Sequence, residues 1–444
     1  MKTCLIIHQE HSGNAATISS HYSAFSTYGK AFYATMTPDQ LLGFSEDFME
    51  KFDSIIIHYS IYLVTLENVH EHTFNLIKNF KGYKICFIQD EYRHIDNTVD
   101  RLLSLNVDAL YTVCSKQAAE LMYRRFLDAG KSIKYTLTGF AEAFDGKLLE
   151  EVVNLVDWKK RPVDISYRGR DLTREWRWLG RRAHEKAQIS LCGPKFAQKG
   201  LVVDISNDEK DRIYGQDWVK FLKSSKCCLI TISGASVCDF SGKIQQEWND
   251  QFCKMQEWKK IDDLDVIFSA FDGMIDATAI SPRVFDAAAA GTLMIGYRDH
   301  YNGILTPNKH YIPLERDHSD IDEVIQKLKD ENYCMEILKN CFDDLIKSGN
   351  YSYEKFVRDF EEENGFESSS IIDVYPILQS ALARDLANNS VNKQEFIKFS
   401  NVNKLHLLRH KLHLLRHKLH LLRHKIQMQL VFLIATVIKW IRKY

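Results

Sequence analysis

One segment of the sequence places an arginine and a carboxylate where they could bind a charged ligand. Arg283 and Asp286 stand three positions apart within residues 281–292, Ser-Pro-Arg-Val-Phe-Asp-Ala-Ala-Ala-Ala-Gly-Thr. Pro282 suits a first helical turn and Gly291 a helix end, which puts both side chains on one face at a helix start. A guanidinium can pair with a diphosphate through two oxygens, and a carboxylate can accept hydrogen bonds from ribose hydroxyls. The same pattern also fits an ordinary Arg–Asp surface pair on a tightly packed helix.

A second segment runs from an apolar strand into small polar residues, Cys227-Cys-Leu-Ile-Thr-Ile-Ser-Gly-Ala-Ser236. Gly234 would let the backbone approach a ligand closely. The hydroxyls of Ser233 and Ser236, with successive N–H groups, could bind a phosphate. A simple strand-to-helix turn would have much the same sequence.

A third segment, Asp164-Ile-Ser-Tyr-Arg-Gly-Arg170, is a predicted strand followed by a cationic loop. Arg168 and Arg170 flank a glycine at the carboxyl end of this strand, where two guanidiniums are well placed for an anion. Ordinary solvated charge is the alternative interpretation.

The elements that would position these residues follow an alternating pattern. Short apolar runs alternate with segments of helical period, such as 66–80 and 116–129 in the first third and 218–224 and 283–290 later. Such alternation predicts parallel βαβ units and an α/β fold with two doubly wound, Rossmann-like domains. The predicted strands are 4–7, 54–58, 84–88, 109–113 and 135–137, then 164–167, 187–191, 226–232, 274–278 and 293–297.

Sheets of this kind bind ligands at the carboxyl ends of their strands, so a two-domain version would place its substrates in the cleft between the domains. No GxGxxG opens either domain and no GxxxxGK[ST] is present, which removes the main support for dinucleotide and P-loop sites. The predicted divisions are a first domain at 1–155, a second domain at 156–345, a helical return segment at 346–403 and a tail at 404–444.

The cysteines and the first residues bear on the compartment. The ten cysteines include no Cys-x-x-Cys pair and no zinc-type spacing. The opening residues contain only four apolar residues in a row, Cys4 to Ile7, which is too short for a signal-peptide core. These features predict a reduced, cytosolic protein.

Taken together and in order, the three segments resemble a known family. Residues 80–345 resemble bacterial nucleotide-sugar-dependent glycosyltransferases of the GT-B architecture. They are close to the large retaining family typified by sucrose and glycogen synthases, to the CgeB-like group and to capsule and surface-polysaccharide transferases. Residues 283–292 stand where such enzymes carry R-x-F-E-A-x-A-x-G. The other matching stretches are 89–92, 137–140, Asp204-Ile-Ser, Asp211-Arg-Ile-Tyr-Gly215, Trp218, 233–236 and Asp239-Phe-Ser-Gly242.

The resemblance implies that the second domain binds a sugar nucleotide and the first domain the acceptor. Asp286 would replace the family's ribose-binding glutamate, and the diphosphate would be bound by arginines. The implied donor-binding residues are Arg168, Arg170, Ser233, Gly234, Ala235, Ser236, Arg283 and Asp286. Two departures stand out, because Asp286 is one methylene shorter than glutamate and the retaining family's earlier glutamate is Thr278 here.

The chemistry of a diphosphate leaving group suggests which other groups are needed. Arginines and helix N-termini can stabilise its negative charge. No DxD triplet appears at a strand end, although Asp262-Asp-Leu-Asp265 comes near that pattern, so we expect transfer that needs neither a metal nor another cofactor. Asp90 and Glu91, which follow one predicted strand, and His58, at the end of another, are the candidates for a catalytic base. Each of them could equally be a structural cap.

The tail differs from the rest of the chain in charge. The whole chain has a formal net charge of −1, yet ten basic residues and no acidic one lie from Lys404 onward. Residues 405–425 are three copies of Leu-His-Leu-Leu-Arg-His-Lys, which form a basic amphipathic helix when placed on a helical wheel. Such heptads also suit a coiled coil and hence a homo-oligomer, but the repeated Arg and Lys would then face like charges. We therefore favour binding to an anionic membrane surface.

The apolar segment that follows, 426–438, has 13 residues and would rise only about 20 Å as a helix, against a hydrocarbon core of about 30 Å. It is expected to lie in the membrane interface, with Trp440 and Tyr444 at headgroup depth. The tail lacks aromatic residues within the repeats, which argues against nucleic-acid binding.

These observations together predict a peripheral enzyme on the inner face of the cytoplasmic membrane. It would move a sugar from a nucleotide donor to a hydroxyl of a glycan or lipid-linked acceptor in surface-polysaccharide synthesis, of the lipopolysaccharide or capsule type. The alternative is a catalytically inactive, transferase-like scaffold that the tail recruits to the membrane. The absence of a carboxylate at Thr278 keeps that alternative open.

Overall fold

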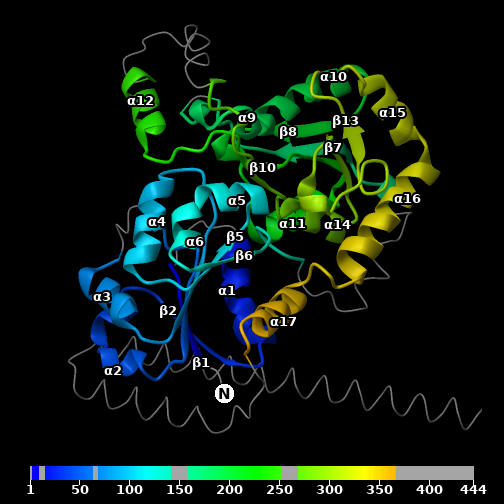
Figure 1. Cartoon of the computed structure of the whole chain (residues 1–444). Helices are drawn as coiled ribbons and strands as arrows, with labels where there is room; N and C mark the ends of the chain where they lie inside the picture. The colour runs from blue at the N-terminus through cyan, green and yellow to red at the C-terminus, as the bar shows by residue number, and fades with distance from the viewer. Residues whose placement is uncertain are drawn as a thin grey trace, which may run out of the picture.

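The computed structural model describes residues 3–9, 16–63, 69–141, 158–173, 175–252 and 269–366. These residues form two parallel β-sheets, each with its own helices, arranged one above the other in Figure 1. The predicted α/β class with two Rossmann-like domains is therefore confirmed. The 404–444 tail and the part of the 346–403 segment beyond residue 366 lie outside the described residues.

The first sheet has six parallel strands in the order β2-β1-β3-β4-β5-β6. Every residue of β1 is buried, as expected for a central strand that is covered on both faces. The strands are β1 (Thr3–Ile7), β2 (Phe32–Met36), β3 (Ser54–Ile57), β4 (Tyr83–Phe87), β5 (Ala109–Thr112) and β6 (Ser132–Tyr135). The helices are α1 (Ala16–Tyr28), α2 (Glu46–Met49), α3 (Glu71–Asn79), α4 (Ile95–Ser104), α5 (Lys116–Met122) and α6 (Arg124–Asp128).

The second sheet has five parallel strands in the order β13-β12-β9-β7-β8. The strands are β7 (Val163–Arg168), β8 (Val203–Ser206), β9 (Ser225–Ile230), β12 (Leu293–Tyr297) and β13 (Ile312–Leu314), and a separate antiparallel pair is β10 (Ser233–Ala235) with β11 (Ala277–Ala279). The helices are α9 (Arg181–Gln188), α10 (Gly193–Gln198), α11 (Gly215–Lys223), α12 (Lys243–Phe252), α14 (Arg283–Ala289), α15 (Ile321–Lys329) and α16 (Glu331–Cys341).

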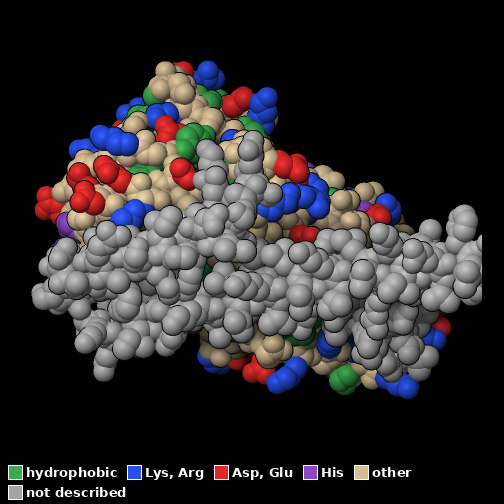
Figure 2. Space-filling view, turned by 90° about the horizontal axis from the view of Figure 1, so that it is seen from below, with side chains coloured by type: hydrophobic (Ala, Val, Ile, Leu, Met, Phe, Trp, Pro, Cys, Tyr) green, Lys and Arg blue, Asp and Glu red, His purple; other side chains and the backbone are tan. Residues whose placement is uncertain are grey.

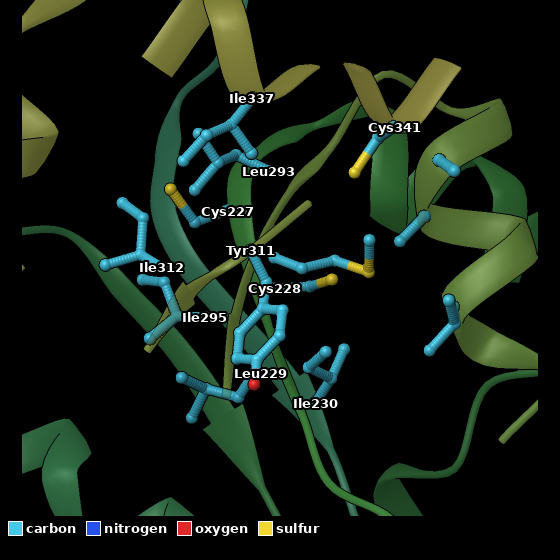
Figure 3. Packing of buried hydrophobic residues seen from close by; sticks show 14 of the residues in the cluster. Cys227, Cys228, Leu229, Ile230, Leu293, Ile295, Tyr311, Ile312, Ile337 and Cys341 are labelled. Carbon is cyan, nitrogen blue, oxygen red and sulfur yellow. The ribbon is translucent and has the colours of Figure 1, made fainter. Parts of the chain in front are cut away.

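The core of the second domain lies against its central strands. Cys227 and Leu229 of β9 pack with Ile295 of β12, and Ile337 and Cys341 of α16 cover the cluster from the helical side (Figure 3). The cysteines of this cluster are buried thiols and act as small apolar side chains.

The chain returns to the first domain at its described end. Helix α17 (Tyr353–Glu363) lies beside α1 in Figure 1, and Phe356 and Phe360 join the core of the first domain. The buried carboxylate of Glu361 accepts hydrogen bonds from Lys30 N at 2.7 Å and Ala31 N at 2.9 Å. The first domain is therefore completed by residues that follow the second domain in sequence.

Most predicted strands are present within a few residues of their predicted bounds, but one prediction is wrong. Residues 187–191 end α9 and continue into a 3₁₀ turn. The buried side chains from this point on, Ile189, Cys192 and Phe196, are three and four residues apart, which is a helical and not an alternating spacing. Strands β2, β8, β10 and β13 were not predicted, and β2, β8 and β13 lie at the edges of their sheets.

Two observations on the described residues relate to the prediction of membrane binding. None of the described helices is long and apolar enough to cross a bilayer. On the face shown in Figure 2, acidic and basic side chains are interspersed over the part of the surface that the structure describes.

Two sets of contacts fix the domains relative to each other. Asp239 N donates to Tyr92 O at 2.9 Å, and Ile95 N donates to Asp239 O at 3.2 Å, so the loop after β4 pairs with the second domain. The hydroxyl of Thr138 also donates to the carbonyl of Ile280. The loop after β4 is therefore joined to the segment after β10, and the loop after β6 to the residue that follows β11.

Candidate functional site

A cavity of about 330 Å³ lies where the two domains meet. Its walls come from the loop after β4 in the first domain and from the carboxyl ends of β7 and β9 in the second. Because β8 and β9 lie on opposite sides of β7, the chain reverses its direction across the sheet at this point. Open α/β sheets bind ligands at such a switch point, so the fold alone marks this cavity as a candidate site.

The cavity is strongly cationic. Five cationic side chains line it, and Asp90 is the one carboxylate among its lining residues. The cationic residues are Arg93, Arg170, Lys186, Arg212 and Arg283. An excess of positive charge at the ends of parallel strands favours a ligand with more than one negative charge.

Lys186 shows the effect of this charge excess most clearly. Burial is the largest cause that lowers the pKa of its ammonium group to about 8; the positive charges of Arg283, Arg170 and Arg212 act in the same direction, and Asp90 opposes them. The ammonium group would regain stability when an anion enters the cavity. Lys186 lies on α9 and was not predicted from the sequence.

Arg283 occupies the predicted position on α14 and lines the cavity. Its guanidinium donates to the carbonyl oxygen of Arg168 and lies 5.5 Å from the ring centre of Trp218 and 5.9 Å from that of Tyr167. These contacts hold the guanidinium in one orientation. Arg283 is therefore preorganised to bind a ligand oxygen.

The other two predicted arginines differ from each other. Arg170 is exposed and lines the cavity, with the carboxylate of Glu209 at 3.9 Å. The guanidinium of Arg168 donates instead to the carbonyls of Asp204 and Asp211, and it pairs with the Asp204 carboxylate at 2.8 Å. Arg168 is not among the lining residues, and its contacts stabilise the edge of the sheet.

The predicted phosphate turn at 233–236 is a short strand. Ser233 lines the cavity, whereas Ala235 is fully buried and Ser236 accepts a hydrogen bond from Arg182 N at 3.2 Å. Gly234 has a φ of 111°, and a Cβ there would lie 2.2 Å from the carbonyl oxygen of Ala277. The glycine is thus needed for the close approach of β10 and β11.

Asp286 and Thr278 are the residues for which the resemblance implies glutamates. Asp286 is exposed on α14 outside the cavity lining, and its carboxylate accepts a hydrogen bond from Trp218 Nε1 at 2.9 Å. Thr278 is buried in β11, and its hydroxyl donates to Asp276 at 2.5 Å.

Asp90, the first candidate for a base, lies at the cavity wall. It follows β4 in a left-handed conformation with a φ of 54°, which is uncommon for a residue other than glycine. Its side chain is exposed and accepts a hydrogen bond from the hydroxyl of Tyr92 at 3.1 Å. Strained backbone at a cavity wall is typical of functional positions.

Glu91 points away from the cavity into the first domain. Its buried carboxylate accepts hydrogen bonds from Thr112 Oγ1 at 2.6 Å, Val113 N at 2.9 Å and Tyr123 Oη at 2.6 Å. Burial raises its pKa. These contacts give Glu91 a structural role that joins the end of β5 to the loop after β4.

His58 is also buried. Its Nδ1 accepts a hydrogen bond from Ser60 N at 3.1 Å, so in the neutral ring Nε2 carries the proton and donates to His21 Nδ1 at 3.1 Å. Burial, with nearby His21 and His8, lowers the pKa of His58 well below 6.5. Both nitrogens are occupied within the first domain, and His58 is not among the residues that line the cavity.

The structure thus brings together Asp90, Arg170, Ser233 and Arg283 of the predicted residues and adds Arg93, Lys186 and Arg212. Arg212 lies in the 211–215 run that resembles surface-polysaccharide transferases, which was a usable signal. Arg93 and Lys186 had no such signal, because isolated charges after a strand or on a helix are common in solvated surfaces. Among the described residues, no cluster of His, Cys, Asp or Glu is arranged to bind a metal ion.

No protein-family model matches the sequence, and no curated protein matches it. Several solved structures are similar to it at low sequence identity. One is Alr3699/HepE of Anabaena in complex with UDP, with 9% identity, a TM-score of 0.45 and coverage of 82% of this chain and 100% of that one. Another is an alpha-glucosyltransferase in complex with UDP-glucose and DNA containing an abasic site, with 10% identity, a TM-score of 0.45 and coverage of 83% and 99%.

A third is sucrose-phosphate synthase from Thermosynechococcus elongatus, with 10% identity, a TM-score of 0.44 and coverage of 82% of this chain and 98% of that one. At such identities and TM-scores, these likenesses support no assignment of a ligand or a reaction to this chain. The charge and position of the cavity are the features that bear on its function.

Proposed function

We propose that this chain is a nucleotide-sugar-dependent glycosyltransferase of the GT-B type. The observation that carries the proposal is the cavity at the switch point of the second sheet, lined by five cationic side chains and one carboxylate. The negative charges of a nucleoside diphosphate attached to a sugar would neutralise the excess positive charge of these residues. The second domain provides four of the cationic side chains and would therefore bind most of the donor.

The cavity can stabilise the leaving group. When the bond between the sugar and the phosphate breaks, negative charge develops on the diphosphate. Arg283 is already oriented by its contacts, and Lys186 and Arg212 lie on other walls of the same cavity. These three cations would share the developing charge, which is why we expect transfer without a bound metal.

Asp90 is the candidate for the base that receives the acceptor proton. It is the carboxylate that the first domain contributes to the cavity, and the first domain is where we expect the acceptor. In this step the acceptor hydroxyl forms a bond to the sugar carbon and its proton passes to Asp90. Glu91 and His58 are unsuited to this role because their polar atoms are engaged inside the first domain.

A scaffold without catalytic activity is the second candidate, and Thr278 favours it. A threonine has no carboxylate, and this one is buried and hydrogen-bonded to Asp276. The chain therefore lacks the acidic side chain that the resemblance implies at this position. Hydrolysis or transfer of a nucleotide sugar by the purified chain would exclude this alternative. Nucleotide binding with neither activity would support it.

The acceptor and the place of action belong to the same proposal. We propose a glycan or lipid-linked acceptor of surface-polysaccharide synthesis and peripheral binding to the inner face of the cytoplasmic membrane through 404–444. Basic residues near an anionic leaflet contribute on the order of 1 kcal/mol each. Deleting 404–444 should abolish co-sedimentation with anionic liposomes and leave the fold intact, whereas unchanged co-sedimentation would contradict membrane binding by the tail.

The experiment that tests the donor site is a calorimetric titration of the full chain with UDP-, GDP-, ADP- and CMP-sugars. We expect one of them to bind and Arg283→Gln to weaken that binding. Arg101→Gln is the matched control, because Arg101 is exposed on α4 and does not line the cavity. Failure of the folded chain to bind any of the four would contradict the proposed function.

A further inference from the structure

Arg93 is the one cationic residue that the first domain contributes to the lining of the cavity. It lies in the loop after β4, which is paired through its backbone with Asp239 of the second domain. Its Cα is therefore fixed at the boundary between the domains.

The side chain of Arg93 is held between two aromatic rings, one from each domain. Its guanidinium lies 5.3 Å from the ring centre of Tyr62 and 4.9 Å from that of Trp176. It also donates a hydrogen bond to the Tyr62 hydroxyl at 2.5 Å. The rings fix the plane of the guanidinium by cation–π contacts and leave its charge uncancelled.

Within the described ranges, no carboxylate forms an ion pair with Arg93, and the Tyr62 hydroxyl is the acceptor that it has. A guanidinium has five N–H donors. A half-buried arginine that lines a cavity with most of its donors unused is suited to bind an oxyanion, because a carboxylate or phosphate can accept two of its hydrogen bonds at once.

We propose that Arg93 binds the sugar-side phosphate of the nucleoside diphosphate, so that this phosphate is contacted from both domains. The inference rests on the proposed function. The acceptor is expected in the first domain, so the phosphate next to the transferred sugar is the one that faces that domain. The second domain contributes the other cationic residues that line the cavity, Arg170, Lys186, Arg212 and Arg283.

This assignment gives Arg93 a role that differs from that of the second-domain cations. A nucleoside monophosphate, which lacks the sugar-side phosphate, would be bound without Arg93. A nucleoside diphosphate would join the two domains through Arg93 and would also keep the cavity closed around the bond that breaks. Charge-assisted hydrogen bonds of this kind are the stronger ones in proteins.

The test compares nucleoside diphosphates with the matching monophosphates on the full chain. UDP, GDP, ADP and CDP are titrated first, and the tightest binder and its monophosphate are then titrated against Arg93→Gln, Arg93→Lys, Arg283→Gln and the control Arg101→Gln. We expect Arg93→Gln to weaken binding of the diphosphate about tenfold or more and binding of the monophosphate less than about twofold. Arg93→Lys should recover part of the loss.

Three results would overturn the inference, and they are distinguishable. If Arg93→Gln binds the diphosphate as the wild type does while Arg283→Gln is impaired, the inference fails and the proposed function stands. If Arg93→Gln weakens the binding of both nucleotides equally, Arg93 only joins the domains through Tyr62 and Trp176. If the folded wild-type chain binds none of the nucleotides, the proposed function fails and the inference with it.

Discussion

The indole N–H of Trp218 donates to the carboxylate of Asp286 at 2.9 Å, while Arg283, one turn earlier on α14, directs its guanidinium toward the Arg168 carbonyl at the cavity. The two charged residues of one motif therefore have different surroundings. Trp218 is a neighbour of both, because its ring also lies under the guanidinium of Arg283. The motif combines a side chain that lines the cavity with one that lies outside it.

We expect Arg283→Gln and Asp286→Asn to differ in their effect on nucleotide affinity. Loss of the guanidinium should weaken nucleoside diphosphate binding by about tenfold or more, since hydrogen bonds to charged groups contribute about 1.5–3 kcal/mol. Asp286→Asn should weaken it less than about threefold. Isothermal titration measures both, and a larger loss for Asp286→Asn would show that the ribose contact implied by the resemblance is formed.

Lys186 should make nucleotide affinity depend on pH. Its pKa is lowered to about 8 in the free protein, and a bound diphosphate favours the ammonium form, so the pKa is higher in the complex. The dissociation constant should therefore rise as the pH increases through about 8, by up to about tenfold per pH unit. Titrations between pH 7 and 9.5 should show this rise in the wild type and a much flatter profile in Lys186→Met.

Asp90→Asn and Glu91→Gln should separate catalysis from stability. Asp90→Asn should lower the transfer rate by about 10²- to 10⁴-fold, the range for general bases, while nucleotide affinity stays the same or increases because a carboxylate leaves an anion site. Glu91→Gln should lower the free energy of unfolding by about 1–3 kcal/mol, because a buried acceptor is lost. Wild-type turnover by Asp90→Asn would remove it as the base.

The histidines of the first domain should make its stability fall in mild acid. Burial lowers the pKa of His8 to about 4 and that of His21 to about 3, whereas both are near 6.5 in the unfolded chain. Below pH 6.5 the unfolded chain therefore binds protons that the folded chain excludes, and stability decreases as the pH falls toward 4. The stabilising contribution is fully present above pH 6.5.

Hydrogen exchange of the β1 and β3 amides at pH 7.5 and 5.5, corrected for intrinsic rates, would measure this loss. His21→Gln should reduce the pH dependence, since it removes one titrating ring. His70→Gln is the control, because His70 is exposed at the start of α3. Equal protection at the two pH values would contradict the prediction.

Transfer should continue in excess EDTA. The reason is the number of cationic side chains at the cavity, which can neutralise a diphosphate without a divalent ion. The measurement is the initial rate of sugar release or transfer with and without chelator, after extensive dialysis. Loss of the rate with EDTA and its recovery with Mg²⁺ or Mn²⁺ would contradict the prediction.

The sequence predicts the fold better than it predicts the site. Strands such as Leu293–Tyr297 are continuous apolar runs, and burial on both faces of a parallel sheet produces such runs, so their ranges could be predicted directly. Residues 187–191, Ala-Gln-Ile-Ser-Leu, alternate apolar and polar residues as a strand can, yet they end α9 and continue into a 3₁₀ turn, since packing against the second-domain sheet decides between the two structures. Short strands at the edges, such as β13, carry too few residues for a pattern.

The site was harder to predict, because the spacing of residues in the sequence does not tell which side chains point into the cavity. Arg168 and Arg170 look equivalent in the sequence, yet Arg168 ends β7 and pairs with Asp204 of β8, whereas Arg170 lies beyond the strand and lines the cavity. Asp90 and Glu91 separate in the same way, one to the cavity and the other to the interior. Arg93 and Lys186 line one cavity only because the loop after β4 and helix α9 converge in the fold, which no local pattern contains.

The return of α17 to the first domain also determines when that domain can finish folding during synthesis. Phe356, Phe360 and the carboxylate of Glu361 complete its core, yet they leave the ribosome after the whole of the second domain. At about 5–20 residues per second, the nascent first domain would wait tens of seconds with Phe25 and Phe87 uncovered. The chain should therefore depend on chaperones until its last described helix has emerged, and truncation before Tyr353 should yield aggregates instead of a smaller soluble protein.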